Sequence, residues 1–338
     1  DRYYCLSKLR YTGKCKKWKD YLFSKDILEN KSNLEKIDIY FAKSNILHNE
    51  KEFKKSSKYL KLANDLKQKI YPSNKCYLIK KSKNLLIETD KIDQNNNKKE
   101  YLPQCIFIVG MPRSGSTLIE SILSMNENLE DLEEINILEE SYFEYKKNYP
   151  RNTLAQLYWK KVSDLKINSN LISNKWLYNY QYAGIIAKQI PNAKIIHCFR
   201  NPLDNLLSIF REHFANGNEF ASSLTESTNI FLDQESMMEE YKTRFRTKIY
   251  DLNYDLLVSN QKKEIRELIS WLGWEWDSIY LSPHLNPRPV LTASSVQVRS
   301  PINNRSIGGW KNYIEMLEPA IKILSKKDKY KNIFLNNQ

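Results

Sequence analysis

The chain has 338 residues, which is enough for one large or two medium domains. It carries 53 Lys and Arg against 40 Asp and Glu, and the first 100 residues, with 25 basic and 13 acidic side chains, hold nearly all of the net charge of +13. No apolar run approaches the 18 residues of a membrane-spanning helix, and no signal peptide is evident, so we expect no membrane span.

Residues 1–75 have the pattern of helices. Within residues 39–70, large and small residues fall near the positions of a tetratricopeptide-type helix pair: Tyr40, Leu47, Ser56, Leu60 and Ala63. The turn is expected near residues 48–51, with His48 on the surface, and Tyr71-Pro72 closes the unit. A polar run then ends near residue 100. We therefore predict a helical tetratricopeptide-like module with its linker at 1–100 and a second domain at 101–338.

The basic character of the first 100 residues has several readings. A basic module can bind nucleic acid, an anionic membrane or an acidic protein, and a lysine-rich surface can also be simply solvated. Arginine is scarce here and no nucleic-acid motif is recognised, so we predict a protein partner and no nucleic acid.

The cysteines indicate the redox environment. There are five, an odd number without a C-x-x-C pair, and two fall in expected buried strands: Cys5, Cys15, Cys76, Cys105 and Cys198. Reduced thiols, and so a cytoplasmic location, are expected.

Residues 105–124 (CIFIVGMPRSGSTLIESILS) predict a buried strand, a loop with two glycines and a helix. This order places backbone N–H groups and the positive end of a helix around one point, where they can bind an anion. The spacing is that of a nucleotide-binding P-loop, but Ser116 stands where lysine is usual, and Arg113 supplies the charge from inside the loop. A phosphate or sulfate ester therefore fits better than a nucleoside triphosphate.

Further elements complete an expected α/β fold of P-loop type, a mostly parallel sheet flanked by helices. Helices are predicted within residues 139–165 and 262–275, a short strand leading into a helix at 171–176, and further strands at 194–200 and 247–253. Arg200 ends the strand at 194–200 and Ser208 lies eight residues later on the next helix, so the strand end and the helix start share one crevice. Arg211 is a further candidate there, and His197 is expected to be a packed strand residue.

The PRSGST loop, the Arg200 and Ser208 pair and the ending Gly308-Gly309-Trp310-Lys311-Asn312 together resemble sulfotransferases that use 3′-phosphoadenosine 5′-phosphosulfate (PAPS). The likeness covers about residues 101–315 and is strongest to tyrosylprotein sulfotransferases and to bacterial tetratricopeptide-linked sulfotransferases. It implies the sulfotransferase fold, PAPS as the donor, adenosine 3′,5′-bisphosphate (PAP) as the product, and no metal. The cofactor-binding residues it implies are Arg113, Ser114, Gly115, Ser116, Thr117, Arg200, Ser208, Tyr254 and Arg299.

The same resemblance implies three catalytic residues. Glu134 lies 21 residues after Arg113, where similar enzymes place the catalytic base, and Glu133 and His213 are the rival bases. Lys175 and Ser294 match residues that contact the transferred group. A carboxylate can take the proton of an attacking hydroxyl, and a lysine can offset charge on the leaving phosphate.

We therefore predict a PAPS-dependent sulfotransferase that acts on a hydroxyl, with protein tyrosine in acidic segments as the favoured acceptor. A saccharide, lipid or small-molecule hydroxyl is the alternative. Two other classes are a repeat scaffold with an inactive transferase domain, disfavoured by the charged residues above, and a P-loop kinase, disfavoured by Ser116.

Overall fold

The computed structural model describes residues 2–8, 16–93, 103–148, 151–167, 169–215, 217–288 and 298–335. These form two compact units. Unit 1 combines residues 1–76, 202–231 and 306–338, and unit 2 combines residues 77–201 and 232–305. Two later segments of the chain, residues 202–231 and 306–338, belong to the same unit as the N-terminal helices, and the predicted domain boundary near residue 100 stays a prediction. No described helix is both long and apolar enough to cross a membrane.

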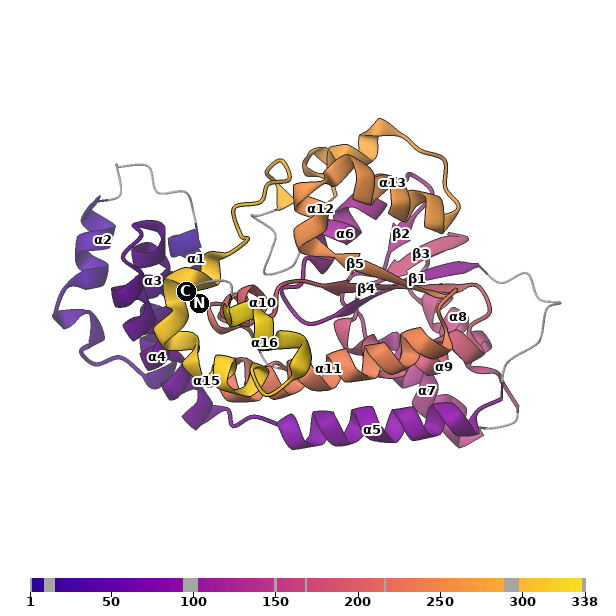
Figure 1. Ribbon diagram of the computed structural model, residues 1–338, viewed down its shortest axis with the longest axis horizontal. Coiled ribbons are helices and arrows are strands. Elements are labelled where there is room, and N and C mark those ends of the chain that lie inside the picture. Colours follow the sequence, from indigo (N-terminus) through magenta and orange to yellow (C-terminus); the bar gives the residue numbers. More distant parts are fainter. Residues whose placement is uncertain are drawn as a thin grey trace. The chain divides into compact units, whose positions relative to one another are not determined.

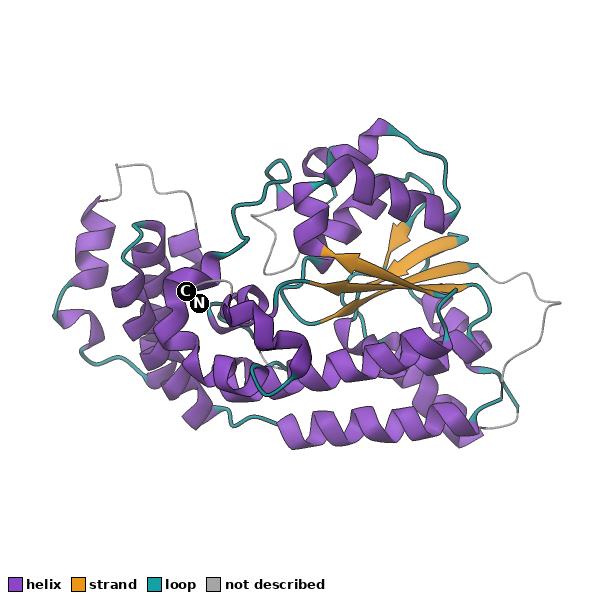
Figure 2. Cartoon of the chain, viewed as in Figure 1, coloured by secondary structure: helices purple, strands orange, loops and turns teal. Residues whose placement is uncertain are grey.

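Unit 2 is built on a five-stranded sheet (Figure 2, orange), in the order β2-β3-β1-β4-β5. All of its strand pairs are parallel: β2 with β3, β3 with β1, β1 with β4, and β4 with β5. The strands are β1 (Gln104–Gly110), β2 (Glu130–Asp131), β3 (Leu171–Asn174), β4 (Ala193–Phe199) and β5 (Ile249–Asn253). The predicted α/β class with a parallel sheet is confirmed, and β2 is an addition that the sequence pattern does not predict.

Helices cover both faces of this sheet (Figure 1). Cys105, Phe107 and Val109 of β1 face a core with the helices α7 (Ile137–Asn148), α8 (Leu154–Asp164), α9 (Ala183–Gln189) and α11 (Leu224–Arg244). The alternate residues Ile106 and Ile108 face a second core with α6 (Ser116–Leu123), α12 (Tyr254–Ser259) and α13 (Gln261–Leu272). Side chains alternate between the two faces of a strand, so an unbroken apolar run fits a strand buried on both sides.

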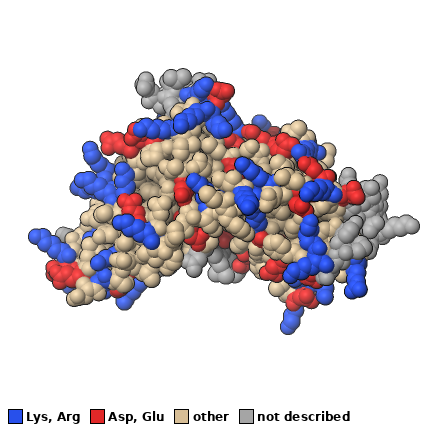
Figure 3. Space-filling model, turned by 90° about the horizontal axis from the view of Figure 1, so that it is seen from below, with Lys and Arg blue, Asp and Glu red and all other residues tan. Residues whose placement is uncertain are grey.

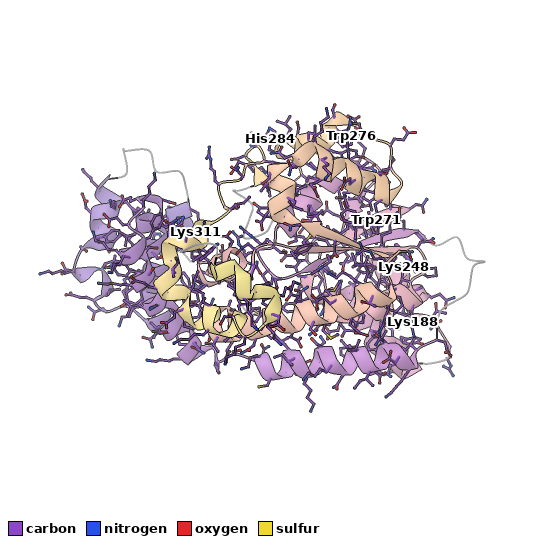
Figure 4. The ribbon with its side chains drawn as sticks, in the orientation of Figure 1. Lys188, Lys248, Trp271, Trp276, His284 and Lys311 are labelled. Carbon is purple, nitrogen blue, oxygen red and sulfur yellow. The ribbon has the colours of Figure 1, made fainter. Side chains whose placement is uncertain are left out.

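Several basic side chains of unit 2 serve structure. Lys248 Nζ donates to the carbonyls of Ile190 and Pro191, which precede β4, and Lys188 Nζ donates to the carbonyls of Thr89 and Ile92 at the end of α5 (Lys75–Lys91). Figure 4 labels both lysines. They satisfy main-chain acceptors near helix ends, as lysines often do, and are therefore part of the scaffold.

Unit 1 is helical, as predicted for its N-terminal part. Its elements are α1 (Arg2–Lys8), α2 (Lys16–Phe23), η2 (Asp26–Leu28), α3 (Asn33–Asn49), α4 (Phe53–Ile70), α10 (Pro202–Phe210), η4 (Glu219–Ser222), η7 (Gly309–Tyr313), α15 (Ile314–Leu324) and α16 (Asp328–Leu335). Ser32 and Glu35 form a capping box that starts α3. Helices α3 and α4 pack closely at Ser44 and Ser56, whose hydroxyl oxygens are 2.8 Å apart.

The expected surface position of His48 is wrong. His48 lies in the last turn of α3 and is partly buried, with Nδ1 2.8 Å from the hydroxyl of Tyr313. Its ring also stacks on that tyrosine, with the ring centroids 5.9 Å apart. Burial lowers the pKa of His48 to about 3, so the imidazole is neutral at physiological pH. His48 is therefore a packing residue of unit 1.

Candidate functional site

The predicted anion cradle forms between β1 and α6. Arg113 and Gly115 both have left-handed backbone angles, with φ of 65° and 99°, and Gly115 is the N-cap of α6. Residues whose backbone alternates between left- and right-handed conformations turn their successive N–H groups toward one point. The first N–H groups of a helix have no partner within the helix and can bind at the same point. Ser114 is buried, and its hydroxyl oxygen has no hydrogen-bond partner among the described residues. These features fit a bound phosphate or sulfate group.

The other predicted residues of unit 2 follow the carboxyl ends of the parallel strands. Glu134 comes three residues after β2, Lys175 directly after β3, Arg200 directly after β4 and Tyr254 directly after β5. In parallel sheets the carboxyl ends of the strands share one edge. Ligands bind at this edge, beside the central strand at which the strand order reverses direction. Strand β1, which lies between β3 and β4, is that central strand.

Lys175 is the centre of an ionic cluster at this edge. Its side chain is 0% exposed, and Nζ lies 3.0 Å from Glu120 Oε2 and 3.0 Å from Glu134 Oε1. Burial alone would lower the pKa of Lys175, but the two carboxylates outweigh it and hold the pKa above its ordinary value. Lys175 is therefore a charged ammonium next to the predicted base, and the catalytic roles of both residues stay predictions.

Glu133 and Glu134 differ in their surroundings. Glu133 has a left-handed backbone, with φ of 54°, and its carbonyl accepts from the N–H of Lys175 at 3.1 Å. Glu133 therefore contacts Lys175 through its main chain, whereas Glu134 contacts the Lys175 ammonium through its side-chain carboxylate. His213, the other rival base, lies in unit 1, where it stacks on Phe41 with 4.8 Å between ring centroids. Burial lowers the pKa of His213 to about 4.

Tyr254 links the cradle to Arg200. A Cβ atom added to Gly115 would come within 2.3 Å of Tyr254 Cδ2, so this ring packs directly on the loop. The Arg200 guanidinium carbon lies 4.7 Å from the centre of the same ring. Asp255 holds the adjacent backbone, since its Oδ2 accepts from the N–H of Asn201 at 2.6 Å.

Ser208, the predicted partner of Arg200, lies on α10 in unit 1, while Arg200 belongs to unit 2. Their joint binding of a phosphate stays a prediction. Within unit 1, the buried Asp204 of α10 accepts from Gly308 N at 2.7 Å and from Trp310 N at 3.0 Å. The Gly-Gly-Trp segment is therefore anchored on the helix that carries Ser208.

The predicted segment over the nucleotide is described only in part. Ser294 lies outside the described residues, as do its neighbours 289–297. The Arg299 guanidinium donates to the carbonyls of Asn286 and Arg288. Its predicted contact with a phosphate stays a prediction.

Two site residues are absent from the sequence interpretation. Glu120 is the single charged residue in the apolar helix α6 (STLIESIL), and this isolated charge was the available signal. Asp204 has a similar signal in α10 (PLDNLLSIF). A charge within an apolar helix is rarely buried unless it has a partner, and both residues have one.

Part of the chain is similar to known proteins. Residues 130–278, which contain Glu134, Lys175, Arg200 and Tyr254, match the model described as "Sulfotransferase family". An uncharacterized protein of Aquifex aeolicus (strain VF5) is 32% identical over 245 residues, which are 65% of this chain and 32% of that protein. The chain thus spans about a third of the length of that relative.

Solved structures also resemble the chain, at low identity. The sulfotransferase domain of the Synechococcus PCC 7002 olefin synthase is 17% identical with a TM-score of 0.46, covering 68% of this chain and 98% of that domain. Mouse sulfotransferase SULT7A1 complexed with PAP is 18% identical with a TM-score of 0.45, covering 75% of this chain and 93% of that one. The match over residues 130–278 thus shows that this part of the chain is similar to the sulfotransferase family.

Proposed function

We propose that the chain transfers a sulfuryl group from PAPS to the hydroxyl group of an acceptor. The observation that carries this proposal is the pairing of Lys175 with Glu134 at the strand edge that also bears the anion cradle. A cation for the leaving phosphate and a carboxylate for the acceptor proton are the two groups that such a transfer needs.

The proposed donor site extends from the cradle to Arg200. Backbone N–H groups of residues 113–117, with the Arg113 side chain and the buried Ser114 hydroxyl, would hold the 5′-phosphosulfate. Arg200 and Ser208 would hold the 3′-phosphate, and Tyr254 would contact the adenine. Ser116 in place of a P-loop lysine disfavours a triphosphate.

The proposed chemistry divides between two side chains. Glu134 is 49% exposed, so its carboxylate can reach an acceptor hydroxyl and take its proton. Lys175 is buried and fixed, so its ammonium can stabilise negative charge that develops on the donor side. PAPS would supply the sulfuryl group, and Ser294 and Arg299 are further proposed contacts to it.

We propose protein tyrosine as the acceptor and α3–α4 as a tetratricopeptide-like pair that binds acidic segments of the target. The small or apolar positions that such a pair requires are buried, with Ser56, Leu60 and Ala63 at most 1% exposed. On the face shown in Figure 3, Lys and Arg side chains are interspersed with Asp and Glu, which suits a protein partner better than a nucleic acid. The described cysteines are free thiols, in keeping with the proposed cytoplasmic location.

Calorimetry with PAP and with ATP tests the donor site. We expect PAP to bind more tightly than ATP, and Arg200→Ala to weaken PAP binding while affecting ATP much less, because ATP lacks a 3′-phosphate. Equal affinity for both nucleotides would contradict the proposal. For the acceptor, an acidic tyrosine peptide should be sulfated faster than a basic one of the same length, and equal rates would count against tyrosine in acidic segments.

A further inference from the structure

Glu120 is a buried carboxylate to which the proposed function assigns no role. It lies on α6, one helical turn after Ser116, and its side chain is 11% exposed. Oε2 pairs with Lys175, while Oε1 is buried and has no hydrogen-bond partner among the described residues. A buried carboxylate is costly unless it is paired, so its presence requires a specific partner.

The two carboxylates that contact Lys175 differ in mobility. Glu134 follows the two-residue strand β2 and is 49% exposed, so it can turn toward solvent. Glu120 is held within a helix whose other side chains pack into the sheet core, including Ile119 and Ile122. If Glu134 leaves the lysine or becomes neutral, Glu120 is the remaining counter-charge for a lysine with no solvent contact.

Other charges face this pair from neighbouring elements. Asp131 of β2 lies close enough to act on Glu120 electrostatically, and it is itself paired with Arg288 Nη1 at 2.7 Å. Glu134 acts on Glu120 in the same direction. Burial, with these two like charges, raises the pKa of Glu120 to about 7 although Lys175 opposes the shift. The charge on Glu120 therefore changes near neutral pH.

We propose that Glu120 is a positioning residue, which holds the Lys175 ammonium at the end of β3 while Glu134 leaves the lysine to accept the acceptor's hydroxyl proton. The pairing itself rests on the structure, and only its consequence for catalysis rests on the proposed function. A residue that acts through Lys175 must lose its effect when Lys175 is replaced.

A double-mutant cycle of Glu120→Gln and Lys175→Gln tests this dependence. We expect Glu120→Gln to lower kcat roughly ten- to a hundredfold with little change in the KM for the acceptor. In the Lys175→Gln background the same change should alter kcat less than about twofold. Glu127→Gln is the matched control, since Glu127 is exposed in the loop after α6 and should leave kcat unchanged. Equal losses in both backgrounds, or a normal kcat in Glu120→Gln, would overturn the proposal.

The pH profile and a charge-keeping variant separate positioning from a loss of folding. The kcat of the wild type should fall on the acid side of about pH 7, and this limb should be absent from the residual activity of Glu120→Gln. Glu120→Asp, which keeps the charge, should recover part of the rate. An unaltered acid limb in Glu120→Gln would contradict the assignment.

A second readout needs no turnover, so it separates this inference from the proposed function. In spectra of protein labelled with ¹⁵N-lysine, a buried, paired ammonium exchanges slowly, and Lys175→Gln identifies its signal by removing it. The signal should persist in Glu134→Gln and Glu127→Gln and be lost in Glu120→Gln. A signal that persists in Glu120→Gln but disappears in Glu134→Gln would overturn the proposal even if PAPS were never used.

Discussion

Replacing Gly115 by alanine tests the geometry of the cradle. Gly115 has φ of 99°, and an added Cβ would lie 2.3 Å from Tyr254 Cδ2, closer than real Cβ contacts allow. The left-handed backbone costs about 1–2 kcal/mol for an L-residue. The forced shift of a packed ring adds about 1–3 kcal/mol. We therefore expect a loss of about 3 kcal/mol, which in a unit of this size lowers Tm by roughly 6–12 °C.

Gly273→Ala is the matched control for this measurement. Gly273 caps α13 with φ of 79°, but nothing lies within 4 Å of its added Cβ, so it bears only the backbone cost. Differential scanning calorimetry should rank the Tm values as wild type, Gly273→Ala, then Gly115→Ala. PAP binding should weaken only in Gly115→Ala, because the displaced ring also packs on Arg200. A Gly115→Ala protein that melts no lower than the control and binds PAP normally would show that the Tyr254 ring does not restrict this position.

Two further predictions concern buried carboxylates. Asp204→Asn replaces charge-assisted bonds to the N–H groups of Gly308 and Trp310 with weaker ones, so urea unfolding should show a loss of roughly 1–3 kcal/mol at unchanged m, and wild-type stability would contradict that anchor. The pKa of Glu120 is about 7 in the folded state and 4.5 ordinarily. Between pH 4.5 and pH 7 the carboxyl group is therefore protonated in the folded state and ionised in the unfolded state. Its contribution to stability should therefore fall by about 3 kcal/mol as pH rises from about 4.5 to about 7 and then level off. The free energy of unfolding of wild type and of Glu120→Gln can be measured by urea unfolding at several pH values. A difference between the two proteins that stays constant over this pH range would rule out this contribution of Glu120.

The sequence predicts the central sheet well and its edge poorly. Strands β1 and β4 lie between two layers of helices, so both of their faces are buried. This burial requires a mostly apolar run, which can be recognised in the sequence alone. Strand β2 consists of Glu130 and Asp131 within an acidic run, where no apolar pattern can reveal it. Its pairing with β3 depends on contacts that only the folded sheet supplies.

The site shows the same division between local and distant information. Gly115 and Arg113 were recognisable because a tight turn leaves a local pattern. Glu120 was not, because its partner Lys175 is 55 residues later in the chain. His48 was misplaced for a similar reason, since Tyr313, which covers it, is 265 residues away. Tertiary contacts of this kind override what the neighbouring sequence suggests.

Sulfuryl transfer with Glu134 as the base can be measured as the transfer of labelled sulfate from PAPS to an acidic tyrosine peptide. The rates are compared between wild type, Glu134→Gln and the exposed control Glu127→Gln. We expect the wild type and the control to label the peptide and Glu134→Gln to lose roughly a hundredfold or more in rate while still binding PAP. Full activity in Glu134→Gln would contradict its role, and no transfer to the peptide or to a cell lysate by a wild-type protein that binds PAP would contradict the proposed activity.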